Sequence, residues 1–83
     1  MASERILIVD DEPYVRTLMA AMLEKANYTT VLAANGDEAI DHVEQDAPYD
    51  LILSDIVMSG LDGIGLLERI RHVYPDTPMV MVT

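Results

Sequence analysis

The sequence predicts a single α/β domain in which a doubly wound parallel sheet is covered by helices. Apolar runs of strand length alternate along the 83 residues with segments whose apolar residues recur at the helical period. The short runs are apolar at successive positions, as in parallel strands that are buried on both faces. Because strand–helix–strand crossovers are right-handed, four such strands with three intervening helices form a doubly wound sheet.

The first half of the chain gives two strands and one helix. The first strand is expected over 5–9, and a helix is expected to begin at Pro13, because proline fits the first turn of a helix. Asn27 is expected to end this helix, and a second strand follows over 29–33. The helix has one apolar stripe, which consists of Val15, Leu18, Met19, Met22 and Leu23.

The second half repeats the alternation. Asn35-Gly36 predicts a turn, and a second helix is expected over 37–45. A third strand over 51–53, a third helix and a last strand over 79–82 complete the pattern. The apolar positions expected to face the sheet are Ala39, Ile40 and Val43 in the second helix, and Ile64, Leu67, Ile70 and Val73 in the third.

The predicted helices cover the two faces of the sheet unevenly. Three helices cannot cover four strands equally, so the first helix is expected to lie nearly alone on its face. The last strand runs to Thr83 with no helix after it. We therefore expect that a further strand–helix stretch is missing by truncation or is supplied by a partner chain.

Composition and charge exclude several classes of function. The chain has no cysteine, which rules out disulfides and thiolate metal sites. It shows no signal peptide and no apolar run near the ~18–20 residues of a membrane span, so we expect a soluble, cytoplasmic protein. Fifteen acidic residues against five lysines and arginines give a net charge of −10, which disfavours direct nucleic-acid binding.

Three acidic residues follow two of the expected strands. Asp10 and Asp11 come directly after the first strand, in ILIVDDEP, and Asp55 follows the third, in LILSD. In a sheet of strand order 2-1-3-4 these strands are neighbours, and ligands bind at their carboxyl ends. Three carboxylates gathered there would repel one another by several kcal/mol at an effective dielectric constant of about 20. A divalent cation removes that cost, and oxygen ligands at an open edge favour Mg²⁺.

Each acid also has an ordinary structural interpretation. An aspartate just before Pro13 is a common helix N-cap, and an aspartate at the end of a strand is a common turn residue. An N-cap explains only one of the two adjacent acids, however, and it does not explain Asp55. The joint arrangement on two strands therefore favours a cation site.

A carboxylate beside Mg²⁺ can act as a nucleophile toward a phosphoryl group without a partner base. The chain shows no serine–histidine–acid order, no HExxH motif and no glycine-rich phosphate loop. His42 and His72 fall in predicted helices, and we interpret both as surface residues. None of the usual base residues is therefore suitably placed, and a carboxylate nucleophile does not need one.

The stretches ILIVDDEP, LILSDIVMSGLDG and MVMVT resemble the receiver domain of two-component response regulators, and the resemblance covers the whole chain. It implies that Asp55 accepts a phosphoryl group from a histidine kinase or a phosphorelay protein. It also implies that Asp10 and Asp11 form the acidic pair that holds Mg²⁺, with Asp11 and Asp55 as direct ligands. The backbone carbonyl of Val57 would complete the protein's share of the coordination. Thr83 matches the hydroxyl that moves to contact the phosphoryl group.

The chain departs from the family pattern in two ways. Ser59 stands where the family usually has proline, which would loosen the loop, whereas Gly63 fits the glycine after the phosphorylation loop. The family also continues through a fourth helix, a fifth strand that ends in a lysine, and a fifth helix. Lys25, the only lysine here, falls at the end of the first helix and cannot replace the missing one. We therefore interpret residues 1–83 as the N-terminal portion of a receiver domain. We expect it either to dimerise through its uncovered sheet face or to be the ordered part of a longer chain.

Three functions compete at this point. The leading hypothesis is a Mg²⁺-dependent phosphoryl-accepting signalling module that is not itself an enzyme. The alternative is a truncated receiver scaffold that acts only in dimerisation or interaction, without phosphotransfer. An aspartate-nucleophile phosphatase is disfavoured, because such enzymes usually carry a second acid two residues after the nucleophile, where this chain has Val57.

Overall fold

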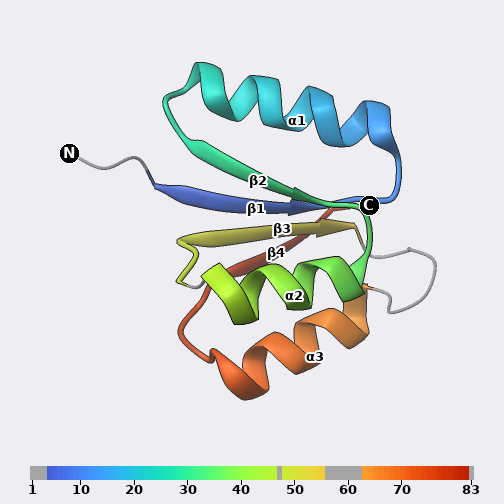
Figure 1. Cartoon of the computed structure of the whole chain (residues 1–83), viewed down its shortest axis with the longest axis vertical. Coiled ribbons are helices and arrows are strands. Elements are labelled where there is room, and N and C mark those ends of the chain that lie inside the picture. Colours follow the sequence, from blue (N-terminus) through green and yellow to red (C-terminus); the bar gives the residue numbers. More distant parts are fainter. Residues whose placement is uncertain (1–3, 47, 56–62, 83) are drawn as a thin grey trace.

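A four-stranded parallel sheet forms the centre of the computed structural model, which describes residues 4–46, 48–55 and 63–82 (Figure 1). The strands are β1 (Arg5–Val9), β2 (Thr29–Ala33), β3 (Leu51–Asp55) and β4 (Met79–Val82). Their order in the sheet is β2-β1-β3-β4, and every neighbouring pair is parallel. The predicted fold class and strand order are both confirmed.

Helices cover the two faces of the sheet unequally, as three helices require. Figure 1 shows α1 (Pro13–Lys25) on one side of the sheet, and α2 (Gly36–Asp46) and α3 (Gly63–Val73) on the other. Within the described ranges, no helix is long and apolar enough to cross a membrane.

The buried side chains form one cluster on each face of the sheet. Successive residues of β1 point to opposite faces, so Leu7 and Val9 join one cluster while Ile6 and Ile8 join the other. The cluster under α2 and α3 is the larger because two helices cover it. Its buried members are Leu7, Val9, Ala33, Ala39, Val43, Tyr49, Ile52, Leu66 and Ile70.

The predicted apolar stripe of α1 was only partly right. Met19 and Leu23 pack with the buried Ala20 against the sheet, but Leu18 and Met22 are 47% and 65% exposed. Val15 is also exposed, at 38%, so three of the five stripe residues stay exposed. No second helix lies beside α1 on this face among the described residues to cover them.

In α3 the buried positions are Leu66 and Ile70. The predicted stripe was right at Ile70. It was wrong at Ile64 and Val73, which are 47% and 60% exposed, and at Leu67, which is half-buried while its neighbour Leu66 is fully buried.

Asn27 ends α1 as predicted. Its φ of 73° lies in the left-handed region, which asparagine tolerates better than most residues. The Asn27 N–H donates to the Glu24 carbonyl at 3.0 Å, and the Tyr28 N–H donates to the Leu23 carbonyl at 3.1 Å. This pair of bonds is a Schellman motif, and it turns the chain directly into β2.

The start of α2 differs from the prediction by one residue for a clear reason. Asn35 Oδ1 accepts a hydrogen bond from the Glu38 N–H at 2.8 Å, and Glu38 Oε1 accepts one from the Ala34 N–H at 3.2 Å. This reciprocal pairing is of the capping-box type. Asn35 is therefore the cap of α2 and Gly36 its first residue, so the Asn-Gly dipeptide begins the helix instead of forming a separate turn.

Arg5 fixes the connection from α2 into β3 at the amino-terminal edge of the sheet. Its guanidinium donates to the carbonyls of Asp46 at 2.6 Å and Pro48 at 3.1 Å, and it lies 4.5 Å from the centre of the Tyr49 ring. The Arg5 and Asp50 backbones are also bonded, at 2.8 Å. These contacts set where β3 begins, and so which of its residues reaches the opposite edge.

We expect Tyr49→Phe to leave the stability unchanged or to raise it by about 1 kcal/mol, because the phenolic oxygen is buried with no hydrogen-bond partner among the described residues. Burial raises the pKa of Tyr49 above its usual value of 10.0, the nearby Asp46 carboxylate raises it further, and Arg5 opposes the shift. The unfolded chain therefore ionises first, and stability is lost as the pH rises above 10.

Urea unfolding at neutral pH and above pH 10 measures both effects. The alkaline loss of stability should be smaller in Tyr49→Phe than in the unchanged chain. Tyr14→Phe is the matched control, because Tyr14 is 76% exposed. Equal alkaline destabilisation of the unchanged chain and Tyr49→Phe would contradict the assignment.

Candidate metal and phosphoryl site

The register of the two central strands brings the predicted acids together. Val9 of β1 lies opposite Ser54 of β3, so Asp10 and Asp55 occupy the next position on adjacent parallel strands. Asp11 follows on the segment that leads from β1 into α1. All three residues therefore lie at the carboxyl edge of the sheet, where β1 and β3 diverge toward helices on opposite faces.

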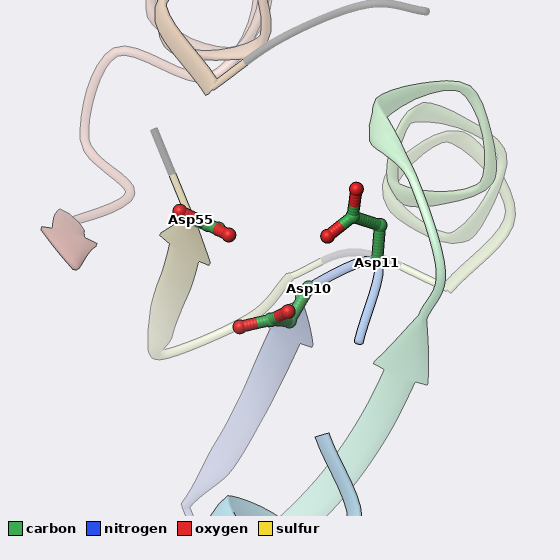
Figure 2. Close-up of side chains that lie close together, drawn as sticks. All are labelled: Asp10, Asp11 and Asp55. Atoms are coloured by element: carbon green, nitrogen blue, oxygen red, sulfur yellow. The ribbon is translucent and has the colours of Figure 1, made fainter. Parts of the chain in front are cut away.

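The three carboxylates converge on one space. One oxygen from each of Asp10, Asp11 and Asp55 lies within 4.8 Å of the other two. Figure 2 shows the Asp11 and Asp55 side chains pointing toward one another, with Asp10 beside them at the tip of its strand. Asp10 is 9% exposed and Asp55 is half-buried, so two of the three carboxylates are partly shielded from solvent.

Asp10 is held at three points. Its N–H donates to the Ala33 carbonyl of β2 at 3.2 Å, and its Oδ1 accepts from the Glu12 N–H at 2.9 Å. The Arg16 guanidinium donates to its backbone carbonyl at 2.7 Å. Glu12 is the N-cap residue of α1, but its side chain makes no capping hydrogen bond. The Asp10 side chain accepts from the Glu12 N–H instead. The prediction that one of the acids caps this helix is therefore correct in part.

The donor set fits a hard divalent cation. All three ligand groups are carboxylates, which Mg²⁺ prefers to nitrogen or sulfur ligands. One oxygen from each of the three residues lies within 4.8 Å of the other two, so a single cation would draw on all three carboxylates. Without a cation, three negative groups at this spacing oppose one another. Asp10, Asp11 and Asp55 would hold the ion, with water completing its shell.

Two residues predicted for the site, Val57 and Thr83, lie outside the described residues, as does Ser59. Gly63 is the first residue of α3. Lys25 ends α1, which runs back toward the amino-terminal edge of the sheet, so it lies away from the acids.

The histidines take no part in the acidic cluster. His72 is exposed near the end of α3, whereas His42 is half-buried in α2 and so less of a surface residue than the sequence predicted.

Two residues that bind the backbone of the acids were missed. Arg16 bonds the carbonyl of Asp10, and the buried Ser54 donates from Oγ to the carbonyl of Asp55 at 3.0 Å. Both bonds end on main-chain oxygens, which a sequence pattern does not display. The only signal in the sequence was an arginine one turn into a helix that follows an acidic pair.

A parallel sheet in this order, with carboxylates gathered at the switch point between its central strands, is the flavodoxin-like architecture of CheY-type signalling domains. The chain belongs to the response regulator receiver domain family, whose sequence profile matches residues 6–83. It is 44% identical over 79 residues to the transcriptional regulatory protein BaeR of Escherichia coli O6:H1, a match that covers 95% of this chain and 32% of BaeR. It is 39% identical over 83 residues to the sporulation initiation phosphotransferase F of Bacillus subtilis, which covers 100% of this chain and 66% of that protein.

Solved structures agree with this assignment. A CheY-like receiver domain from Methanospirillum hungatei has a TM-score of 0.93 and 32% identity, over 98% of this chain and 64% of that one. Receiver domains are signalling modules of two-component systems that interact with histidine kinases or phosphorelay proteins. They typically bind Mg²⁺ at an acidic pocket, and this chain has such a cluster of aspartates.

Proposed function

We propose that this chain accepts a phosphoryl group on Asp55 from a histidine kinase or a phosphorelay protein, in a reaction that needs Mg²⁺. The observation that carries the proposal is the convergence of Asp10, Asp11 and Asp55 within 4.8 Å at the carboxyl edge of the sheet. Membership of the receiver family supports the same assignment.

Asp55 is the nucleophile in this proposal. One of its carboxylate oxygens forms a bond to phosphorus while the bond from phosphorus to the donor's histidine nitrogen breaks, and the imidazole keeps the electron pair. An ionised carboxylate attacks without a general base, which agrees with a site built from acids. The product is an acyl phosphate on Asp55.

The remaining residues of the site hold and neutralise charge. Mg²⁺, when bound, offsets the negative charge of the phosphoryl oxygens and of the carboxylates that surround them. Asp10, fixed through its N–H, carboxylate and carbonyl, presents its side chain from a rigid position. By resemblance, the Val57 carbonyl would be a further ligand and the Thr83 hydroxyl would contact the phosphoryl group.

Incubation with acetyl phosphate tests this function directly. With Mg²⁺ present we expect a single acid-stable, base-labile phosphoryl adduct, which tandem mass spectrometry places on Asp55. A chelator should prevent its formation. Labelling on a serine or threonine, or labelling that is indifferent to the chelator, would argue against the proposal.

A second candidate function is an interaction module, and the exposed apolar surface beside α1 favours it. Val80 and Val82 of β4 are 47% and 40% exposed. Both lie on the α1 side of the sheet, because Val80 pairs with Leu53 and Val82 with Asp55. The same side of the sheet has a hollow of about 150 Å³, which is lined by Met19, Met22, Leu23 and Leu53. We call this surface the α1-side apolar face.

We expect the 83-residue chain on its own to self-associate through the α1-side apolar face. Apolar burial would drive the contact, while the net charge of −10 on each copy opposes it. Association should therefore strengthen with added salt and weaken in the double variant Met22→Gln, Val80→Thr. Sedimentation at several protein and salt concentrations measures this, and a compact monomer at every condition would exclude the interaction.

A further inference from the structure

Arg16 links helix α1 back to the tip of β1. It lies in the second turn of the helix and is half-buried. Its own N–H makes the ordinary helical bond to the Glu12 carbonyl at 3.0 Å, but its side chain reaches past Glu12 to the carbonyl of Asp10 at 2.7 Å. The acceptor is a backbone oxygen, so this contact does not use up a carboxylate oxygen of the cluster.

The bonded carbonyl belongs to the peptide unit that joins Asp10 to Asp11. Because a peptide unit is planar, fixing the direction of its C=O also fixes its N–H and the position of the next Cα, which is that of Asp11. The other side of Asp10 is held by Ala33 and its carboxylate by Glu12. The Arg16 hydrogen bond therefore fixes the orientation of the peptide that connects the anchored Asp10 to Asp11.

We propose that Arg16 is a positioning residue of the cation site, which aims the Asp11 carboxylate at Asp55 by holding the Asp10–Asp11 peptide. The inference rests on the proposed function, since it takes the cation to be Mg²⁺. Arg16 itself touches neither the cation nor the phosphoryl group.

Charge and geometry make opposite predictions for Arg16. A positive charge near the site repels any divalent cation, so its loss through charge alone would tighten Mg²⁺ and Ca²⁺ binding alike. A loss of positioning would weaken the binding of both cations, and it would weaken Mg²⁺ binding more than Ca²⁺ binding. Mg²⁺ demands near-ideal octahedral ligands at 2.0–2.1 Å, whereas Ca²⁺ accepts six to eight oxygens at 2.3–2.6 Å in flexible arrangements. The selectivity between the two cations therefore reports positioning.

Calorimetric titration of Arg16→Met with Mg²⁺ and with Ca²⁺ tests the inference on the intact chain. We expect the Mg²⁺ dissociation constant to rise about tenfold or more, as for other groups that orient metal ligands, and the Ca²⁺ constant to change much less. Arg71→Met is the matched control, because Arg71 is exposed in the last turn of α3 and its loss removes the same charge. Its cation affinities should equal those of the unchanged chain.

Arg16→Lys separates charge from geometry. Lysine keeps the charge but not the planar fork of the guanidinium, so its selectivity should resemble that of Arg16→Met. Three outcomes would overturn the inference while leaving the proposed function intact. They are an unchanged Mg²⁺/Ca²⁺ selectivity in Arg16→Met, an equal loss of affinity for both cations in that variant, and a selectivity in Arg16→Lys that equals that of the unchanged chain. An unchanged chain that binds neither cation would overturn both. Thermal unfolding without metal checks that each variant is folded.

Discussion

Asp55→Asn is expected to abolish phosphoryl labelling completely. The substitution keeps the size and shape of the side chain but replaces the nucleophilic carboxylate with a neutral amide, which cannot form an acyl phosphate. Asp55 ends β3 at half-buried depth, and the amide can occupy the same place. The measurement is intact-mass spectrometry after incubation with acetyl phosphate and Mg²⁺.

Asp41→Asn is the control for this variant, because Asp41 is an exposed aspartate on α2. It should be labelled like the unchanged chain. Circular dichroism spectra that match for both variants would show that the fold survives. If Asp55→Asn were labelled as fully as the control, the phosphoryl acceptor would have to be a different residue, and the proposed function would fail at its central step.

The sequence predicted the fold well because the parts that decide it are local. Continuous apolar strands, a proline at the start of α1 and an asparagine at its end each act over a few residues, and all three behave as expected. The acidic cluster was predictable for a related reason. Once strand order places β1 beside β3, the register carries Asp10 and Asp55 to the same edge.

What the sequence did not reveal depends on the partners of each element in three dimensions. The exposure of Leu18 and Met22 follows from the absence of a neighbouring helix beside α1 among the described residues, not from the helical period. The bonds from Arg16 and Ser54 end on carbonyl oxygens, whose direction only the folded backbone defines. Local patterns thus placed the carboxylates, whereas tertiary contacts orient them.

The second large effect is expected in Asp11→Asn, which should stabilise the fold without metal but weaken the site when Mg²⁺ is present. Without metal, Asp11 lies within 4.8 Å of two other carboxylates, so removing its charge relieves repulsion. After allowance for screening by solvent, the gain in the free energy of unfolding should be about 1 kcal/mol. With Mg²⁺ the same change removes a ligand, and affinity should fall at least about tenfold, which corresponds to 1.4 kcal/mol.

Urea unfolding with and without Mg²⁺ measures both halves of this reversal. The unchanged chain should be stabilised as Mg²⁺ rises, because the ion binds only the folded state, whereas Asp11→Asn should begin more stable and gain little. Asp10→Asn distinguishes this from a general effect of charge. Its amide replaces the carboxylate that accepts the Glu12 N–H, so relief of repulsion there is offset by a weaker bond. An Asp11→Asn chain that is less stable without metal would show that the three carboxylates do not oppose one another, and the case for a cation at this edge would lose its physical basis.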